Sequence, residues 1–451
     1  MAEEGRAIAK WEGLVIFIEK VVPGDIVDVR IRKKHSSYLE GEMVELRKPS
    51  PLRIDPFCQH FGTCGGCKWQ YLDYESQLKY KQKQVMETLI RIGKIPNPNV
   101  MAILGSANTR YYRNKLDYTF ADKKWLTREE YAEREEAGGP ALGFHIPGKF
   151  DKVLDIETCY LQPDPSNAIR LAVRKYCLEH EIPFMNLRHK AGMMRGLIIR
   201  NTLAGGLMVI VMVYENDQEV LEGLLRHLET TFPQITSLLY IVNPKGNDTF
   251  HDLEVKTWSG LPYITEEMEG LQFRIGPKSF FQTNSGQTLE LYKIARDFAG
   301  LQGHEIVYDL YTGTGTIALF ISRTVKKVVG IEYVQESIEN AKLNAELNGV
   351  SNSVFFAGDM KDLLKEELFR QEGHPDVIIT DPPRAGMHFD VVEQLLKSNC
   401  PKIVYVSCNP ATQARDVQML SEKYDLIKVQ PVDMFPHTAH VESVALLELR
   451  G

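Results

Sequence analysis

The stretch Asp309-Leu310-Tyr311-Thr312-Gly313-Thr314-Gly315 decides the fold that this sequence predicts. An apolar run ends just before it and a helical run begins at Ile317, so both glycines fall in a turn between a strand and a helix. Glycine in such a turn lets the backbone pass close to a ligand whose polar end lies at the helix N-terminus. The pattern predicts a nucleotide-binding turn. Taken alone it allows NAD, because Gly313-x-Gly315-x-x-Ala318 also matches the dinucleotide fingerprint.

From about residue 300 onward, short apolar runs alternate with segments of helical length. The runs are Glu305–Tyr308, Lys327–Ile331, Val354–Ala357, Val377–Thr380 and Ile403–Val406. Alternation of this kind is typical of a doubly wound α/β sheet. Ligands and reactive groups in such sheets lie at the carboxyl ends of the strands. The residues that follow each run are therefore the first candidates for a functional site.

Three motifs in the last quarter carry reactive side chains. They are Asp381-Pro382-Pro383-Arg384, Ser407-Cys408-Asn409-Pro410 and His437-Thr438-Ala439-His440-Val441-Glu442. A thiol with carboxylates suits methylation of a pyrimidine carbon, because C5 of uracil is a poor nucleophile until a thiolate adds to C6. Cys408 is the candidate thiolate, and Glu442 is the candidate general base that afterwards removes the C5 proton.

The surroundings of Cys408 and Asp381 favour this interpretation. Asn409-Pro410 opens a helix, and a helix N-terminus is expected to lower the pKa of Cys408. The alternative for Cys408 is a small buried core residue. Enzymes that methylate exocyclic amines follow a similar Asp-Pro-Pro with an aromatic residue, whereas Arg384 stands here. Asp381 can accept a hydrogen bond from N3–H of uracil, a donor that neutral cytosine lacks.

Together these motifs resemble those of the S-adenosylmethionine-dependent RNA (uracil-5-)-methyltransferases, and within that family the iron–sulfur ribosomal RNA enzymes of the RumA type. The resemblance runs from Val22-Pro23-Gly24-Asp25 to Glu442. It implies an α/β fold with a Rossmann-like class I methyltransferase domain, an N-terminal OB-like (TRAM) β-barrel and a mixed α+β central iron–sulfur domain. The implied divisions are 1–50 for the barrel, 51–69 and 106–260 for the central domain, and 70–105 and 261–451 for the catalytic domain.

The first half of the chain agrees with this division. Three runs alternate apolar and polar residues, namely Leu14 to Ile18, Ile26 to Arg32 and Tyr38 to Leu46, and they predict a small antiparallel barrel. Residues 74–93 predict a charged helix that ends at Gly93. The highly charged segment 123–136 predicts a surface helix within the central domain.

The resemblance also assigns site residues beyond Cys408 and Glu442. S-adenosylmethionine is expected to contact Gln282, Asp309, Tyr311, Gly313, Gly315, Glu332, Asp359 and Asp381. The target uridine is expected to contact Arg113, Phe280 and Asp381. Glu332 closes the second strand, where a carboxylate can accept hydrogen bonds from both ribose hydroxyls. The alternative for Asp359 is a turn carboxylate after a strand, and no role is assigned to the two histidines before Glu442.

Seven cysteines occur in the chain, and three of them form the cluster Cys58-x5-Cys64-x2-Cys67. Three thiols within ten residues can surround one metal centre, and a fourth ligand must come from elsewhere. Zinc, with His60 as a ligand, is an alternative. The resemblance implies a [4Fe–4S] cluster on Cys58, Cys64, Cys67 and Cys159. Because relatives that methylate tRNA lack this cluster, it also implies 23S ribosomal RNA as the substrate.

Charge and composition constrain the location and the partners. The 451 residues carry a formal net charge of −7, yet residues 1–100 hold 16 Lys plus Arg against 13 Asp plus Glu. Basic clusters at Arg30–Lys34 and at Lys79, Lys81 and Lys83 are candidates for following an RNA backbone. We expect a cytoplasmic protein, because the sequence shows neither a signal peptide nor a membrane span.

Three other functions remain open at this point. One is the same C5 methylation on tRNA. Another is an NAD-dependent Fe–S oxidoreductase, which leaves Cys408 and Glu442 without a role. The last is a non-catalytic RNA-binding protein, which does not need Cys408. If the chain is the methyltransferase, the target uridine must be flipped out, because neither face of C5 and C6 is reachable within a base stack.

Overall fold

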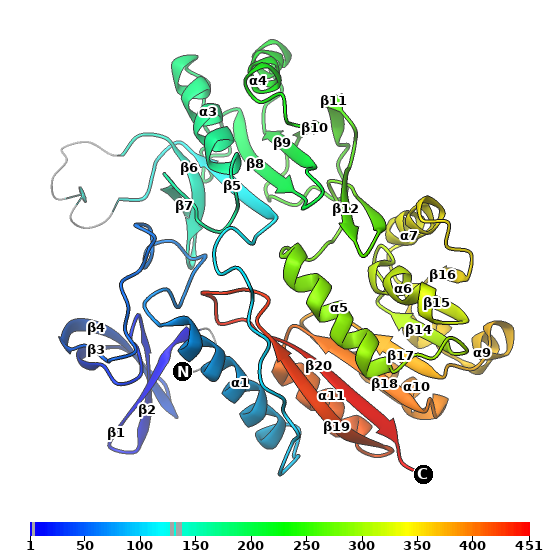
Figure 1. The fold of residues 1–451 in the computed structure, drawn as a ribbon. Helices are drawn as coiled ribbons and strands as arrows, with labels where there is room; N and C mark the ends of the chain where they lie inside the picture. Colours follow the sequence, from blue (N-terminus) through cyan, green and yellow to red (C-terminus); the bar gives the residue numbers. More distant parts are fainter. Residues whose placement is uncertain (2–4, 127–129, 132–137) are drawn as a thin grey trace.

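The parallel strands predicted from the turn outward form the largest part of the C-terminal half (Figure 1). The structure, a computed structural model, describes all residues except 2–4, 127–129 and 132–137. The helix expected over 123–136 lies largely outside the described residues. Among the described helices, none is long and apolar enough to cross a membrane.

The C-terminal sheet has the strand order β16-β15-β14-β17-β18-β20-β19. Its strands are β14 (Ile306–Leu310), β15 (Lys327–Glu332), β16 (Ser353–Ala357), β17 (Val377–Thr380), β18 (Lys402–Ser407), β19 (Tyr424–Val432) and β20 (Glu442–Leu449). The first five are parallel, as predicted, and β20 pairs antiparallel with both β18 and β19. The order reverses at β14, which creates the topological switch point where such sheets bind ligands.

Helices cover both faces of this sheet, which confirms the doubly wound fold. One face packs against α5 (Ser285–Ala299), α6 (Thr316–Ile321) and α7 (Gln335–Leu347). The other packs against α10 (Phe389–Ser398), α11 (Pro410–Leu420) and the N-terminal helix α1 (Tyr74–Arg91). The short helices α8 (Met360–Leu363) and α9 (Glu366–Glu372) follow β16. The strands are buried on both sides, which explains their continuous apolar runs.

Helix α1 joins the C-terminal sheet although it is far away in sequence. Asp73 caps its first turn by accepting a hydrogen bond from Ser76 N at 2.9 Å. The helix packs on α11 and β19, and the chain after it forms bridges to β19 at Val100 and Leu104. The N-terminal part of the chain therefore supports the edge of the sheet from which the last motif begins.

The N-terminal sheet consists of β1 (Ala7–Trp11), β2 (Leu14–Glu19), β3 (Ile26–Lys34) and β4 (Tyr38–Lys48), in the order β1-β2-β4-β3. The prediction of an entirely antiparallel barrel is wrong in one respect, because β2 and β4 are parallel. The hairpin of β3 and β4 folds back as a unit, so its second strand runs alongside β2. Strand β1 was not predicted.

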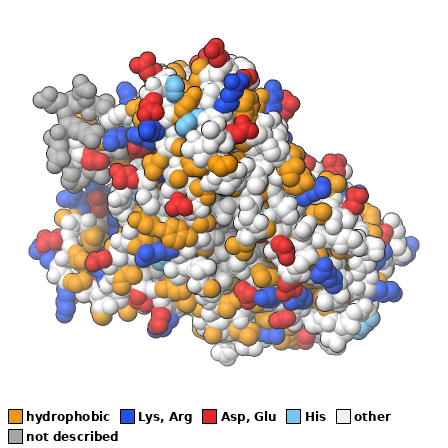
Figure 2. Space-filling model, turned by 45° about the horizontal axis from the view of Figure 1, so that its top comes forward, with side chains coloured by type: hydrophobic (Ala, Val, Ile, Leu, Met, Phe, Trp, Pro, Cys, Tyr) orange, Lys and Arg blue, Asp and Glu red, His pale blue; other side chains and the backbone are white. Residues whose placement is uncertain are grey.

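The central sheet has the order β11-β10-β9-β8-β5-β6-β7. Its strands are β5 (Lys115–Ala121), β6 (Ala141–Ile146), β7 (Lys149–Asp155), β8 (Met194–Asn201), β9 (Leu207–Val213), β10 (Ser237–Val242) and β11 (Lys256–Gly260). Helices α3 (Ser166–Glu179) and α4 (Gln218–Thr231) cover one face. The hairpin β12 (Ile264–Met268) and β13 (Leu271–Ile275) then leads into α5 and shares its core. Figure 2 shows acidic and basic side chains interspersed over the face in view.

Candidate active site

A single large cavity of 2090 Å³ contains most of the residues that the sequence analysis selected. Pockets for small ligands usually measure about 300–1,000 Å³, so this one has room for more than one ligand. The predicted residues along its wall are Cys58, Cys64, Cys67, Arg113, Cys159, Phe280, Gln282, Tyr311, Gly313, Glu332, Asp359, Asp381, Cys408 and Glu442. Asp309 and Gly315 lie behind the wall.

The glycine-rich turn forms one end of the cavity. Gly313 has φ 56°, and a Cβ there would meet nothing within 4 Å, so its backbone is open to a ligand. Gly315 has φ 79° and caps α6, where a Cβ would approach that of Ala341 to 3.0 Å. Glu332 accepts hydrogen bonds from Gly313 N at 3.2 Å and Val334 N at 3.0 Å. This carboxylate therefore both braces the turn and faces the cavity.

Two of the expected cofactor contacts have structural duties. Asp309 is buried, and its Oδ2 accepts hydrogen bonds from Thr312 Oγ1 at 2.5 Å and Ala318 N at 3.0 Å. It holds the turn in shape and is not among the residues that line the cavity, and its contact with the cofactor stays a prediction. Asp359 lines the cavity, but it also caps α8 and forms an ion pair with Lys361 at 3.3 Å. Asp359 thus has, at least in part, the role of a turn carboxylate, which was the alternative to a cofactor contact.

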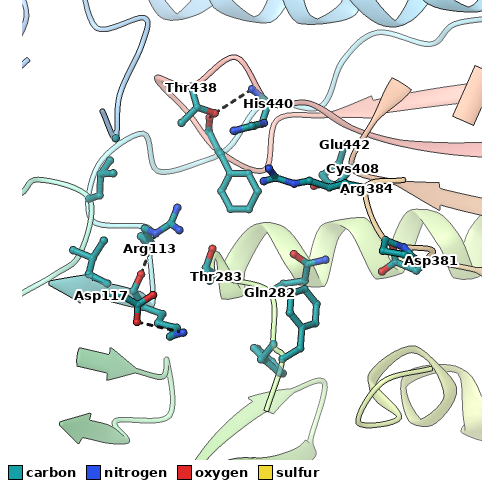
Figure 3. A pocket seen from close by; sticks show the side chains of 18 of the residues that line it. Arg113, Asp117, Gln282, Thr283, Asp381, Arg384, Cys408, Thr438, His440 and Glu442 are labelled. Atoms are coloured by element: carbon teal, nitrogen blue, oxygen red, sulfur yellow. Dashed lines mark hydrogen bonds and ion pairs between the residues drawn. The ribbon is translucent and has the colours of Figure 1, made fainter. Parts of the chain in front are cut away.

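Three reactive side chains come together where β17, β18 and β20 meet the cavity (Figure 3). Asp381 follows β17, Cys408 follows β18 and Glu442 begins β20. Burial, together with the charge of Asp381, raises the pKa of Glu442 to about 8. Burial and the charge of Asp309 raise the pKa of Asp381 to about 7. These carboxyl groups therefore titrate near neutral pH instead of near pH 4.

The prediction of a lowered thiol pKa is wrong. Burial raises the pKa of Cys408 to about 11, and the charges of Glu442 and Asp381 add to this effect. Asn409 is the residue that caps α11, so Cys408 lies one position before the cap. Arg384 opposes the increase, and Figure 3 shows it beside Cys408 and Glu442. A cation bound among these carboxylates would lower their pKa values and relieve their mutual repulsion.

The opposite wall carries the residues expected to contact a base. Arg113 donates from Nε to the Lys115 carbonyl at 3.0 Å, and its guanidinium carbon lies 5.8 Å from the ring centroid of Phe435. Phe280 is 73% exposed although it is a large aromatic residue. The side chain of Gln282 points into the cavity in Figure 3, while its backbone carbonyl accepts a hydrogen bond from Asn114 at 2.9 Å.

The loop before Glu442 is held by residues that the sequence analysis did not identify. His437 has a φ of 64°, and its carbonyl accepts hydrogen bonds from the backbone N–H groups of Lys68 and Trp69 at 2.8 and 3.0 Å. Gln77 accepts from the His437 N–H at 2.9 Å and donates to Nδ1 at 3.2 Å. No local signal could have revealed these pairs, because the partners are about 360 residues apart. His437 thus joins the cysteine loop to the loop of the candidate base.

The four cysteines of the predicted metal site all face the same cavity as free thiols. Burial raises the pKa of each of them, to about 11 for Cys64 and about 12 for Cys67. In the described part of the chain, no three or more His, Cys, Asp or Glu side chains are gathered closely enough to hold a metal ion. The cluster therefore stays a prediction. His60 Nε2 accepts a hydrogen bond from Glu157 N at 3.0 Å, which occupies that nitrogen.

The sheet order, the glycine-rich turn and the acidic strand ends define an S-adenosylmethionine-dependent methyltransferase of the Rossmann-like class. Residues 263–450 match the family described as tRNA (Uracil-5-)-methyltransferase, and residues 2–44 match the TRAM domain. The chain belongs to the RNA (uracil-5-)-methyltransferase family, which confirms the resemblance drawn from its motifs.

Relatives of full length support this assignment. An uncharacterized RNA methyltransferase of Bacteroides thetaiotaomicron is 59% identical and covers 100% of both chains. One from Porphyromonas gingivalis is 52% identical over 99% of this chain and 98% of its own. Among solved structures, the Pyrococcus abyssi tRNA (uracil-54, C5)-methyltransferase in complex with S-adenosyl-L-homocysteine has a TM-score of 0.75 at 28% identity. It covers 98% of this chain and 100% of its own.

Proposed function

We propose that this protein methylates C5 of a uridine in 23S ribosomal RNA, with Cys408 as the nucleophile and Glu442 as the base. The observation that carries the chemistry is the meeting of Asp381, Cys408 and Glu442 in one cavity with the glycine-rich turn. In an NAD-dependent oxidoreductase these three side chains would have no catalytic role. We also propose the division of the chain at residues 50, 69, 105 and 260, and a cytoplasmic location, where such RNA is found.

The thiolate of Cys408 adds to C6 of the flipped uracil, so an S–C6 bond forms and electron density moves to C5. Asp381 accepts the N3–H and orients the ring. After C5 has become methylated, Glu442 takes its proton, and the electrons of that C–H bond restore the C5–C6 double bond as the S–C6 bond breaks. Because the pKa of Glu442 is about 8, the base is partly ionised at neutral pH and can also release the proton afterwards.

S-adenosylmethionine, when bound, supplies an electrophilic methyl group. The residues present fit this cationic molecule, because the turn at Gly313 is open and the strand ends beside it are acidic. Glu332 would hold the ribose hydroxyls, and Asp359, Gln282 and Tyr311 would line the remainder of the site. The acidic cluster favours a positively charged ligand over the neutral product, which assists exchange.

The class of RNA is the finer part of the proposal. The cysteine pattern and its resemblance to the ribosomal RNA enzymes support 23S ribosomal RNA. A tRNA substrate is the second candidate, and one observation favours it: the Pyrococcus abyssi structure, titled a tRNA (uracil-54, C5)-methyltransferase, covers 98% of this chain. Because a tRNA enzyme is similar to this chain over its full length, the set of domains does not distinguish a tRNA substrate from 23S ribosomal RNA.

A methyl-transfer assay separates the two candidates. We expect tritiated methyl groups to enter unmodified 23S ribosomal RNA and not tRNA, with 5-methyluridine as the labelled nucleoside after digestion. Cys408→Ala is the control and should label neither RNA. Label in tRNA alone would establish the second candidate, and label on a base other than uracil would contradict the proposed chemistry.

We further propose that Cys58, Cys64, Cys67 and Cys159 hold a [4Fe–4S] cluster. Four thiols on the wall of one cavity form a set of soft ligands, which suits iron–sulfur centres. The occupied Nε2 of His60 argues against a zinc site that uses this histidine. The residue after Cys67, Lys68, donates its N–H to the His437 carbonyl, so the cluster would stabilise the loop that leads to Glu442.

Protein purified without air should therefore be brown, with about four irons per chain and broad absorbance near roughly 400 nm. Cys64→Ala should lose the iron and melt at a lower temperature. Cys177→Ala is the matched control, because Cys177 is a buried thiol outside the cavity, and it should retain the iron. Stoichiometric zinc without iron or sulfide in protein never exposed to air would overturn the assignment.

A further inference from the structure

Four of the five carboxylates of the cavity wall lie at one of its ends, where Arg384 and Arg415 also line it. The carboxylates Glu332, Asp359, Asp381 and Glu442 lie around the glycine-rich turn and the strand ends. The other end, formed by the central sheet and the cysteine loop, carries Lys68, Arg113, Lys115 and Lys149. The one carboxylate there, Asp117, forms an ion pair with Lys115 at 3.3 Å. A chain with a net charge of −7 has thus placed a basic surface at this end of its active-site cavity.

Strand β7 begins at this basic end with Lys149, and its second residue is an exposed aromatic one, Phe150. Phe150 is 72% exposed and belongs to the cavity wall. Its neighbour Lys149 places Nζ 4.2 Å from the ring centroid of Trp125. The turn between β6 and β7 rests on the cysteine loop, since a Cβ at Gly65 would come within 2.8 Å of Pro147 Cγ. An exposed phenylalanine at the start of a strand loses the benefit of burial, which a stacking partner would restore.

We propose that Phe150 and Lys149 form a subsite for a nucleotide next to the target uridine in a single strand of RNA. Phe150 would stack on the base and Lys149 would pair with a phosphate. Aromatic rings stack on any base, and lysines neutralise the backbone, so this combination suits single-stranded nucleic acid. The inference rests on the proposed function only in taking the cavity as the site that receives RNA.

The position of the subsite favours RNA over a protein partner. Phe150 lines the same cavity as Cys408, so a strand whose uridine reaches Cys408 can extend toward the turn. A flipped nucleotide leaves its neighbours unstacked, and these need a new surface to cover their faces. The basic side chains around Phe150 complement the phosphates between those nucleotides.

Binding of a uridylate dodecamer in the presence of S-adenosylhomocysteine tests the proposal without turnover. We expect Phe150→Ala to weaken dodecamer binding on the order of tenfold, whereas Phe150→Trp should retain it. Binding of uridine monophosphate should be the same in all variants. Lys149→Ala should reduce the slope of log affinity against log salt by about one. Leu203→Ala is the matched control, because Leu203 is 73% exposed and lies outside the cavity wall.

Wild-type dodecamer affinity in Phe150→Ala would overturn the inference, as would an equal loss in Leu203→Ala. A change in oligomeric state in Phe150→Ala without loss of RNA affinity would assign the ring to contacts between copies and also overturn it. Failure of the proposed function looks different. In that case the protein transfers no methyl group to any RNA, while the affinity difference between Phe150→Ala and Phe150→Trp still reports on the subsite.

Discussion

Replacement of Cys408 by alanine should abolish both the methylated product and any denaturant-resistant protein–RNA adduct, whereas Glu442→Gln should trap the adduct. The two side chains act at opposite ends of one covalent cycle, because the thiolate must add to C6 before methyl transfer and the base is needed only afterwards. In Glu442→Gln, labelled methyl groups should appear on a cross-linked species that migrates slowly in a denaturing gel. The loss of turnover should be about 10²–10⁴-fold, the usual contribution of a general base.

The pH dependence of the melting temperature is the control experiment for the variant Glu442→Gln. The folded state raises the pKa of this carboxyl from 4.5 to about 8, so between these values the folded protein holds a proton that the unfolded chain releases. The Glu442 contribution to stability therefore falls as pH rises through this window, and it is lost in full above the folded pKa. Because glutamine has no charge, the variant should melt at a higher temperature than wild type above pH 8, while the two converge in acid.

Either of two results would contradict the assigned roles. One is adduct formation by Cys408→Ala. The other is turnover at the wild-type rate by Glu442→Gln. A melting curve of Glu442→Gln that follows the wild-type curve at every pH would show instead that Glu442 is not buried beside Asp381.

Lys81→Met should destabilise the protein by about 3–5 kcal/mol, because it leaves the carboxylate of Asp433 buried without its partner. Lys81 and Asp433 are both fully buried, and Nζ lies 2.5 Å from Oδ1. Lys81 also donates to the Phe435 carbonyl at 3.1 Å, at the start of the loop that leads to Glu442. We therefore expect activity to disappear at a temperature below that of the melting transition, as the loop loosens first.

Two further variants make this prediction specific. Lys83→Met lies on the same helix but removes only an exposed pair with Glu87, so it should change stability by less than about 0.5 kcal/mol. Replacing the pair as a whole, with Lys81→Met and Asp433→Leu together, should recover part of the loss, because no unpaired charge remains. Urea denaturation followed by tryptophan fluorescence measures all three. Equal effects of Lys81→Met and Lys83→Met would contradict the prediction.

The sequence analysis grouped three lysines of α1 as one candidate RNA-binding surface, but the structure separates them. The spacing of Lys79, Lys81 and Lys83 was consistent with a surface that follows RNA, since all three carry the same charge. Burial separates them, because Lys81 points between α1 and the catalytic loop and its pKa is lowered by loss of solvent. Sequence reports which charges are present, but only packing decides which of them reach water.

Local patterns in the sequence were sufficient for the five parallel C-terminal strands and for α1, because buried parallel strands have continuous apolar runs and the helix begins at a capping aspartate. They did not reveal that β2 and β4 are parallel or that β19 and β20 close the sheet as an antiparallel pair. Strand pairing depends on contacts between distant segments, which no window of neighbouring residues contains.

The sequence by itself determined the family, the glycine-rich turn and the identity of the thiol and the carboxylates, because these depend on residue type and spacing. Only the tertiary structure decided their chemical state. Burial beside Asp381 raised the pKa of Glu442 to about 8. Burial and the charge of Glu442 raised the pKa of Cys408 to about 11. It also placed His437 between the cysteine loop and the catalytic loop. These properties arise from the low dielectric and the close packing of groups far apart in the chain, so they exist only once the chain has folded.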